Sequence, residues 1–415
     1  MAMIRPLPEK VRQLDVSIGQ ATAPGQLLKS SIYEFRYLDA SPDQPAVALL
    51  MPARERLTWQ DGDLFPALDQ NLPEGELYLR VRALFPKQPL TPMNLLALVG
   101  RNGIGRLGFS LPGAEPVAAG RTISRAELVA TRYSPEVFDE LVAAYLSTGV
   151  GIAGVQPKIM VPDRPTIPIP SLIVKAGSAA YPGLAANEHL CLSAARCAGI
   201  EVPGFELSDD GQMLILDRFD LVEQPDGRIE RLGFEDIAAL AGLRVRDVLS
   251  DRKYQGSYQR VAELLRQLRL SGSDLSRFFA QIAFTVMVRN GDAHLKNFGV
   301  LYRSPDDIRL APMFDVVTTS IYSYARYTGG PDMQDRTLAL KLYAGRHASR
   351  AYPTREELFD FGRRVCGVAH PQHTAQAIAT GMQATLAEAR QDDRVSPGLL
   401  RALRAEWEEG LRYAA

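Results

Sequence analysis

The chain has 415 residues, of which 46% are hydrophobic and 23% charged, and its formal net charge is -1 at pH 7. This length exceeds one ordinary hydrophobic core, so we expect two or three domains or lobes of a globular protein. The near-zero charge excludes a surface that is basic throughout, which a protein devoted to binding nucleic acid would have.

The three cysteines, Cys191, Cys197 and Cys366, form no Cys-x-x-Cys pair, which favours a reducing compartment over a disulfide scaffold. The first residues, MAMIRPLPEK, carry charges and prolines, and no apolar stretch follows them. The longest apolar runs are far shorter than a membrane span. We therefore expect a cytoplasmic protein with no signal peptide and no membrane partner.

The first part of the chain, residues 27–110, predicts a mixed, strand-rich structure. Residues 46–52 (AVALLMP) indicate an apolar strand ended by proline, whereas residues 76–85 fit either a helix or a strand. The segment 94–113 contains five glycines and is expected to turn more than once. Helical sequence follows over 122–149, with the pair Ser134-Pro135 as the N-cap and first helical residue.

Residues 151–222 predict a second region that contains strands. Two short strands, QPKIMV and SLIVK, flank a proline-rich connection, and a helix over 187–199 ends at Gly199. Residues 213–219 (MLILDRF) indicate a buried strand, and the tripeptide at 225–227 (PDG) a hairpin turn.

Helical periodicity dominates from about residue 234 onward. Apolar residues between Leu275 and Met287 recur at helical spacing, with Ser273 or Asp274 as the cap, and residues 354–413 predict several more helices. The expected fold class is α+β. We predict a strand-rich N-terminal domain over 1–125, a second strand-containing lobe over 126–222 and a helical lobe over 223–415.

The helix over 275–288 leads into a segment dense in functional side chains, RNGDAHLKNFGVLY (289–302). Asp292 and Asn297 have the D-x-x-x-x-N spacing that is typical of the catalytic loop of protein kinases. A carboxylate can orient the attacking hydroxyl and accept its proton, and an amide oxygen suits Mg²⁺. Asp315, in LAPMFDVV, then supplies a second acid for the metal, although Phe-Asp-Val replaces the usual Asp-Phe-Gly.

The upstream region contains candidate contacts for a nucleotide. Lys175 ends the strand SLIVK, where a kinase places its phosphate-binding lysine, and its acidic partner is left open between Glu188, Glu201 and Glu206. The glycines of GVGIAGVQPK, chiefly Gly151 and Gly154, would let backbone N–H groups approach phosphates, and Lys158 would add charge. Because a strand and not a helix follows these glycines, a dinucleotide-binding reading fails.

The backbone between Asp217 and Phe219 is expected to bind adenine as a hinge.

Together these segments resemble HipA-type serine/threonine kinases, the toxin half of a bacterial toxin–antitoxin pair. The resemblance is carried by NGDAHLKNFGVLY, APMFDV, GIAGVQPKIMV and LILDRFD, and in the first domain by ALDQNLPEGELYLRVRALF and NLLALVGRNGIGRLGF. It implies an ATP- and Mg²⁺-dependent kinase fold in which Asp292 is the catalytic base, Asn297 and Asp315 bind metal, and His294 lies near the phosphates.

The resemblance also implies a substrate and partners. Members of the family phosphorylate aminoacyl-tRNA synthetases, typically glutamyl-tRNA synthetase, which stalls translation and promotes growth arrest and persistence. They pair with a small helix-turn-helix antitoxin of the HipB type and contact operator DNA mainly through it, as co-repressors. One departure concerns self-inactivation: a serine that the family often phosphorylates in its glycine loop is replaced by Ala153.

Three other functions are compatible with parts of the sequence. The catalytic loop alone also fits a small-molecule phosphotransferase with a kinase-like fold. Gly291-Asp292-x-His294 resembles a fragment of a metallophosphohydrolase motif, but the chain has five histidines and lacks the other parts of that motif. An inactive kinase fold retained as a DNA-bound partner is the non-enzymatic alternative.

Overall fold

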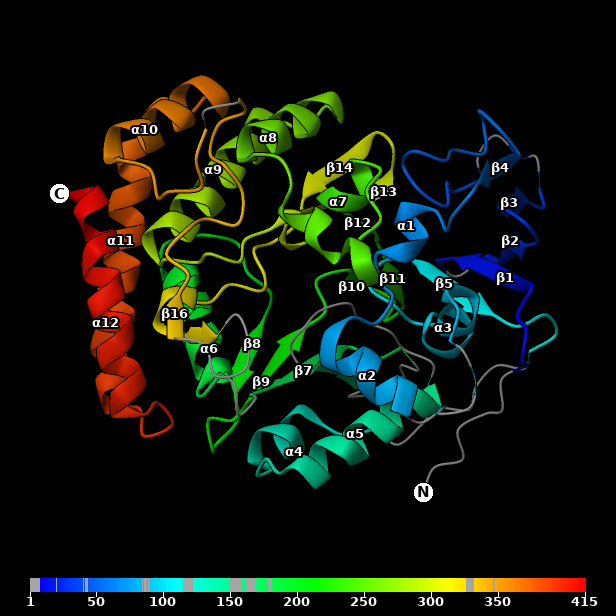
Figure 1. Cartoon of the computed structure of the whole chain (residues 1–415), viewed down its shortest axis with the longest axis horizontal. Coiled ribbons are helices and arrows are strands. Elements are labelled where there is room, and N and C mark those ends of the chain that lie inside the picture. Colours follow the sequence, from blue (N-terminus) through cyan, green and yellow to red (C-terminus); the bar gives the residue numbers. More distant parts are fainter. Residues whose placement is uncertain are drawn as a thin grey trace. The chain divides into compact units, whose positions relative to one another are not determined.

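A computed structural model of the chain describes residues 8–19, 21–39, 41, 44–83, 85, 88, 90–114, 122–148, 158–161, 169–177, 181–325, 332–345 and 348–415. The chain divides into two compact units, whose elements are labelled in Figure 1. Unit 1 comprises Met1–Ala176, Ile215–Arg252 and Val300–Asp307, and unit 2 comprises Gly177–Leu214, Lys253–Gly299 and Ile308–Ala415.

Unit 1 contains an antiparallel sheet of five strands in the order β4-β3-β2-β1-β5. Its strands are β1 (Gln13–Ile18), β2 (Ala21–Lys29), β3 (Tyr33–Tyr37), β4 (Thr58–Asp61) and β5 (Leu107–Ser110). Alternate residues of β1 are buried, so one face of this sheet forms a core. Three helices accompany it: α1 (Pro66–Asp69), α2 (Gly75–Ala83) and α3 (Pro92–Val99). The mixed, strand-rich character expected of this region is confirmed, and α2 makes the ambiguous segment helical as far as Ala83.

The strand predicted for residues 46–52 is wrong. These residues form bends and turns, although Ala46, Val47 and Ala48 are buried. The backbone N–H of Val47 donates to the Tyr37 hydroxyl at 2.7 Å, and that of Leu49 donates to Glu235 at 2.7 Å. Because side chains satisfy these backbone groups, Ala46, Val47 and Ala48 are buried without a neighbouring strand, whereas Leu50 is exposed.

The remainder of unit 1 combines three helices, strands of two small sheets and a hairpin. The helices α4 (Arg125–Ala130) and α5 (Pro135–Thr148) precede β6 (Lys158–Val161) and β7 (Leu172–Ala176), and β9 (Met213–Asp217) lies beside β7. The hairpin of β10 (Leu221–Glu223) and β11 (Ile229–Arg231) confirms the predicted turn at 225–227. A second sheet has the order β12-β13-β14, formed by β12 (Gly233–Asp236), β13 (Gly299–Ser304) and β14 (Asp307–Leu310), and α7 (Ile237–Leu240) follows β12.

A buried network connects the glycine-rich segment 102–107 with the residues after β9. Arg218 and Asp220 form an ion pair whose side chains are both 0% exposed. Arg218 donates to two carbonyls of the 102–107 segment, Asp220 accepts from the N–H of Gly105 at 2.7 Å, and Arg231 donates to the Gly105 carbonyl at 2.7 Å. With φ at +90°, Gly105 adopts a backbone conformation that favours glycine. The glycines of this segment therefore allow a tight turn whose carbonyls accept hydrogen bonds from Arg218 and Arg231.

Unit 2 is mainly helical, with packing centred on a long buried helix. Its helices are α6 (Leu184–Cys197), α8 (Tyr258–Gln267), α9 (Gly272–Met287), α10 (Arg355–Asp360), α11 (Pro371–Glu388) and α12 (Pro397–Leu411). The 3-10 segment η1 (Asp247–Tyr254) ends in this unit. The strands of the unit are β8 (Phe205–Leu207), β15 (Ser323–Ala325) and β16 (Asp332–Gln334). α11 packs against α6 and α9, and α12 packs against α9 and α11 (Figure 1). The predicted helices over 187–199, 275–288 and 354–413 are confirmed.

Two predictions for this half of the chain need correction. The N-cap of α9 is Ser271, whose hydroxyl accepts from the N–H of Asp274, and not Ser273 or Asp274 themselves. Helix also does not dominate without interruption after residue 234, because β12, β13 and β14 form a sheet there. The short buried run of β13 resembles a helix segment in sequence, and its pairing with the distant strand β12 and with the adjacent β14 identifies it as a strand.

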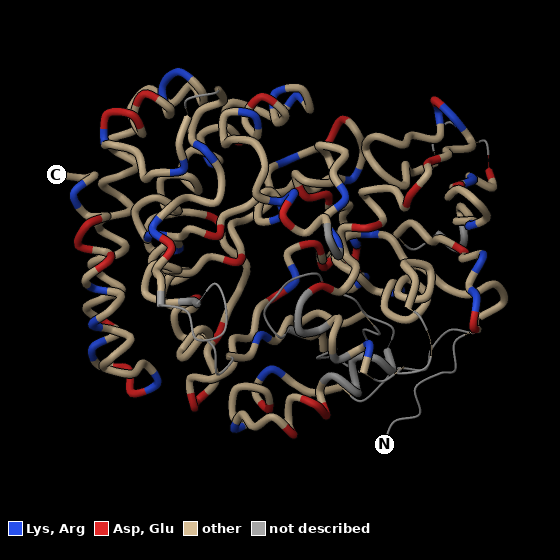
Figure 2. The backbone as a smooth tube through the Cα atoms, viewed as in Figure 1, with Lys and Arg blue, Asp and Glu red and all other residues tan. Residues whose placement is uncertain are grey.

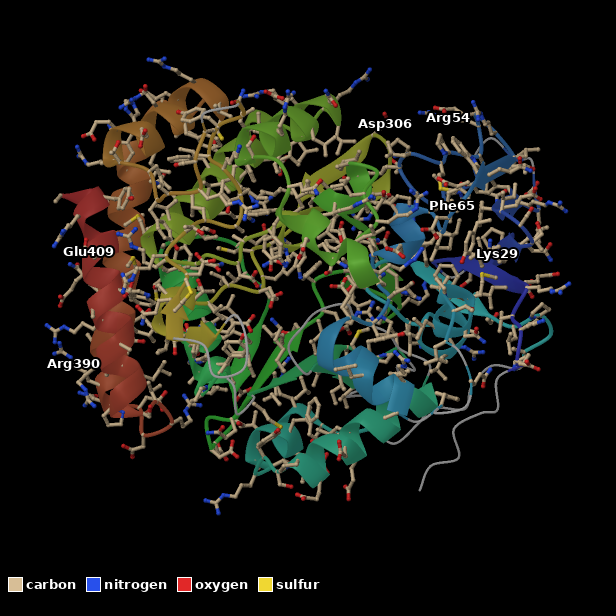
Figure 3. The ribbon with its side chains drawn as sticks, in the orientation of Figure 1. Lys29, Arg54, Phe65, Asp306, Arg390 and Glu409 are labelled. Carbon is tan, nitrogen blue, oxygen red and sulfur yellow. The ribbon has the colours of Figure 1, made fainter. Side chains whose placement is uncertain are left out.

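The outer surface of unit 2 carries mixed charge. Figure 2 shows acidic and basic residues alternating along α12, and Figure 3 labels Arg390 and Glu409 on the outer side of the α11–α12 pair. Glu409 pairs with Arg412 at 2.9 Å and Arg404 with Glu408 at 3.1 Å. Among the helices in the described part of the chain, none combines the length and apolar character that crossing a membrane requires.

Candidate active site

The candidate catalytic loop begins where α9 ends in a left-handed turn. Arg289 has φ of +58°, and the N–H of Asn290 donates back to the carbonyl of Thr285 at 2.9 Å, which closes the helix in a Schellman-type cap. The next residue must be glycine on steric grounds, because a Cβ at Gly291 would lie 2.6 Å from the carbonyl oxygen of Thr337. The loop therefore leaves a rigid, buried helix in a defined direction.

Hydrogen bonds within the loop hold Asp292, His294 and Asn297 in one compact turn. The carbonyl of Asp292 accepts from the N–H of His294 at 2.7 Å and from the side-chain amide of Asn297 at 3.1 Å. The N–H of Asn297 donates to the carbonyl of His294 at 2.9 Å, within the 3-10 turn Leu295–Asn297. The five-residue spacing thus brings the Asn297 amide back to the backbone of Asp292.

Asp315 joins this turn through the same amide group. The Nδ2 of Asn297 lies 3.4 Å from the carbonyl oxygen of Asp315, so one amide contacts the backbone of both acidic residues. Asp315 has φ of +57°, a strained conformation for a residue other than glycine and one that often marks functional sites. Since its Nδ2 faces two carbonyls, the Oδ1 of Asn297 lies on the other side of the amide, where it could bind a cation.

The electrostatic environment of the site distinguishes its titratable groups. Burial among protein atoms and the neighbouring Asp315 raise the pKa of the Asp292 carboxyl, while a hydrogen bond from Tyr254 and the charge of Lys253 lower it. Asp292 also keeps exposed surface, and contact with water limits the size of this shift. Burial and the charge of Lys253 hold the pKa of His294 well below its usual range, so His294 is neutral at pH 7.

Residues after Asp315 connect the two loops to the core of unit 2. The Thr319 hydroxyl accepts from the N–H of Gly291 at 2.6 Å. Asn187 of α6 brackets Thr318: its Oδ1 accepts from the Thr318 N–H and its Nδ2 donates to the Thr318 carbonyl, both at 3.0 Å. The Trp407 indole of α12 donates to the Thr318 hydroxyl at 2.8 Å. The segment that carries Asp315 is thereby held by two helices.

Sequence reasoning missed two residues that lie at the site, Lys253 and Tyr254. The Tyr254 hydroxyl donates to Oδ1 of Asp292 at 2.7 Å, and its ring lies 5.2 Å from the His294 ring in an edge-to-face arrangement. Lys253 is only 5% exposed, and its charge acts on both Asp292 and His294. These residues end a short 3-10 segment with no recognisable motif, so the sequence offers no signal for them.

The candidate nucleotide-binding residues lie in unit 1. Lys175 is 4% exposed in β7 and stands directly opposite Lys158 of β6 in the strand register. Asp217, at the end of β9, forms an ion pair with Arg125, and the Phe219 ring packs against that of Phe234 at 5.4 Å. The intervening N–H of residue 218 donates to the Ser171 carbonyl at 3.0 Å, so one backbone donor of the expected hinge is already engaged.

The remaining residues of the expected site are placed as follows. Gly151 and Gly154 lie outside the described residues, as does Ala153. Glu188 is fully buried in α6 of unit 2, and Glu201 pairs with Arg277 and Arg309. The structure thus brings Lys158 and Lys175 together within unit 1, and Asp292, His294, Asn297 and Asp315 together within unit 2.

The donor set of unit 2 fits a hard divalent cation that completes its coordination with a substrate. The set comprises the carboxylates of Asp292 and Asp315 and the amide oxygen of Asn297, and Mg²⁺ commonly takes few protein ligands together with phosphate oxygens and water. Within the described ranges, three or more His, Cys, Asp or Glu side chains do not gather into a metal-binding group. A dinuclear site of the phosphohydrolase type, which needs several such ligands, therefore gains no support there.

Comparison with known proteins matches both halves of the chain to one family. Residues 14–110 match the HipA N-terminal domain, and residues 150–390 match the HipA-like C-terminal domain. The crystal structure of a Shewanella oneidensis HipA, in complex with HipB and operator DNA, superposes with a TM-score of 0.71 over 97% of this chain and 96% of that one, at 18% identity.

Two curated relatives come from Sinorhizobium fredii and bear the name putative kinase. Y4dM is 31% identical over 167 residues, which span 37% of this chain and 38% of that protein. Y4mE is 26% identical over 277 residues, which span 60% of this chain and 63% of that protein. The alignments thus cover less than two thirds of the length of either relative. The superposition confirms the α+β, kinase-like fold class, and the two domain matches show that this chain belongs to the HipA family.

Proposed function

We propose that the protein is an ATP- and Mg²⁺-dependent serine/threonine protein kinase that acts as the toxin of a toxin–antitoxin pair. The single observation that carries the proposal is the Asn297 amide, whose Nδ2 contacts the carbonyls of both Asp292 and Asp315. This contact gathers a base and two oxygen ligands from segments 18 residues apart. Phosphoryl transfer requires that combination, because it depends on positioning and charge stabilisation.

Each residue of the loop has a distinct part in this proposal. Asp292 accepts the proton of the acceptor hydroxyl, and the Asn297 amide oxygen and the Asp315 carboxylate hold the metal. Magnesium bound there would offset the negative charge of the triphosphate. The neutral, buried His294 can donate one hydrogen bond to a phosphate oxygen, while Lys253 supplies a cation beside the base.

The nucleotide itself is assigned to the elements of unit 1. Lys158 and Lys175 are register partners on β6 and β7, and both would contribute positive charge toward the phosphates of ATP. Gly151 and Gly154 would cover the phosphates with backbone N–H groups, and the backbone between Asp217 and Phe219 would receive the adenine.

Substrate and partners follow from the family. We assign an aminoacyl-tRNA synthetase as the protein substrate, with glutamyl-tRNA synthetase as the first candidate, and growth arrest or persistence as the outcome. A HipB-like helix-turn-helix antitoxin would bind the chain and carry it to operator DNA as a co-repressor. The Shewanella oneidensis relative, solved with HipB and operator DNA, supports that assignment.

The decisive test uses the purified chain, radiolabelled ATP and Mg²⁺ with a desalted bacterial extract. We expect the wild-type protein to label one or a few proteins on serine or threonine, and Asp292→Asn to lower labelling by roughly a thousandfold, because the proton acceptor is lost. Magnesium chelation should abolish labelling. Equal labelling by the D292N variant would refute the assignment of the base, and label transferred only to small molecules would refute a protein substrate.

A further inference from the structure

Tyr254 reaches the candidate base from a segment that belongs to neither catalytic loop. Its hydroxyl donates to Oδ1 of Asp292 at 2.7 Å, across 38 residues of chain. An ionised carboxylate only accepts hydrogen bonds, so the phenol is the donor. With Oδ1 engaged in this way, the second oxygen, Oδ2, is the one that an acceptor hydroxyl can approach.

Tyr254 is itself firmly held. Its ring packs edge-to-face on His294, with 5.2 Å between centroids and 78° between planes. Its carbonyl accepts from the Arg350 side chain at 2.5 Å, and the preceding Lys253 is buried. A residue fixed at the ring and at the backbone presents its hydroxyl in one place.

The chain after Tyr254 gives the same segment a second contact with the catalytic loop. The Tyr258 hydroxyl donates to the carbonyl of Ala293 at 2.9 Å, and the Tyr258 N–H donates to the carbonyl of Lys341 at 2.9 Å. Ala293, the residue that follows the base, is therefore fixed relative to the segment 253–258. A hydrogen bond from Tyr254 thus sets the direction of the carboxylate within an already rigid loop.

The terminal torsion of an aspartate side chain has a broad, roughly twofold energy profile. One fixed donor is enough to select an orientation, and a general base that is wrongly turned by a small amount loses much of its effect. We propose that Tyr254 is a positioning residue for phosphoryl transfer, which holds the Asp292 carboxylate so that Oδ2 faces the acceptor hydroxyl. This inference rests on the proposed kinase function.

Two substitutions separate the effect of the Tyr254 hydroxyl from the effect of its ring. Tyr254→Phe removes the hydrogen bond and keeps the ring against His294, whereas Tyr254→Leu removes both. Tyr343→Phe is the matched control, because its hydroxyl donates to the Glu357 carbonyl in the same unit. The maximal rate of protein labelling and the apparent KM for ATP are measured with radiolabelled ATP and a desalted bacterial extract, and the D292N variant gives the background.

We expect Y254F and Y254L to lower the maximal rate alike, by roughly tenfold or more, the effect of losing a hydrogen bond to a charged group. The KM for ATP should stay unchanged, and Y343F should match the wild type. A purely structural role would instead reduce the thermal midpoint of Y254F or change its KM. Either result, or a loss confined to Y254L, overturns the proposal.

The outcomes also separate this inference from the proposed function. If the wild type labels proteins above the D292N background and Y254F does so equally well, the positioning role is wrong and the kinase assignment stands. If the wild type itself gives no label above that background, both proposals are overturned together.

Discussion

At the scale of single residues, the site depends on side chains that orient other groups as much as on those that would react. Asn297 faces two carbonyls, Thr319 connects the loops that carry Asp292 and Asp315, and Asn187 brackets the residue before Thr319. The left-handed backbone of Asp315 is a further sign of constraint, because residues other than glycine rarely adopt it, although asparagine and aspartate tolerate it better than most.

This constraint allows the charge of Asp315 to be tested apart from its backbone. Asp315→Asn should keep the fold, since asparagine also adopts positive φ, while it weakens the affinity for MgATP by roughly tenfold or more through loss of a charged metal ligand. Titration calorimetry with and without Mg²⁺ measures the effect. Asp306→Asn, an exposed aspartate in a turn, is the control. An unchanged Mg²⁺ dependence in D315N would contradict the assigned ligand.

At the scale of elements, the helix α12 contacts two segments next to the catalytic residues: the end of α9 and the residues that follow Asp315. Trp407 reaches Thr318, and a Cβ at Gly410 would lie 1.8 Å from the carbonyl oxygen of Met287, near the end of α9. The backbones of the two helices therefore lie in close contact just before the chain enters the loop. Glycine is required at this crossing because any larger residue would push α12 away from α9.

Gly410→Ala should accordingly destabilise unit 2 by about 1–3 kcal/mol, the usual cost of overpacking, and lower kinase activity with it. Gly398→Ala lies in the same helix with nothing within 4 Å of the added Cβ, so we expect it to be neutral or stabilising by up to about 1 kcal/mol. Thermal unfolding and labelling assays of both variants make the comparison. Equal stability of the two would show that α12 does not press on α9.

At the scale of the whole molecule, each of the two units buries ionisable side chains, such as Glu235 in unit 1 and Glu188 in unit 2. Unit 1 buries Glu235, whose Oε1 accepts from the N–H of Leu49 and from the Tyr302 hydroxyl, both at 2.7 Å. Burial raises the pKa of Glu235 to about 7; these two bonds and the charge of Arg106 oppose the shift, and Asp236 adds to it. A buried carboxyl of this kind links the N-terminal sheet region with β12 and β13.

The pH dependence of unit 1 follows from that shift. The folded state binds the Glu235 proton more tightly than the unfolded state does. The contribution of protonated Glu235 to the free energy of unfolding is therefore fully present below pH 4.5 and is lost as pH rises to about 7. The loss amounts to roughly 3 kcal/mol at most. Glu235→Gln keeps an oxygen for both donors and should flatten the decline of the thermal midpoint between pH 5 and 8. Glu230→Gln, a partly exposed change, should leave it as in the wild type.

Local spacing in the sequence determined the fold class, several helices and part of the candidate site. The α+β class, the helices over 187–199 and 275–288, and the grouping of Asp292 with Asn297 follow from periodicity and from a spacing that one turn of chain can close. Such features depend on neighbours along the chain, so a single sequence contains the information for them.

Tertiary structure alone decided the rest. Tyr254 and Lys253 join the site, residues 46–48 are buried without forming a strand, and β12, β13 and β14 make a sheet, because partners far along the chain supply the hydrogen bonds. A hydrogen bond between residues 38 positions apart leaves no periodic trace in the sequence, since each residue is compatible with many other surroundings. Only the folded backbone, by placing these groups within bonding distance, selects one arrangement among them.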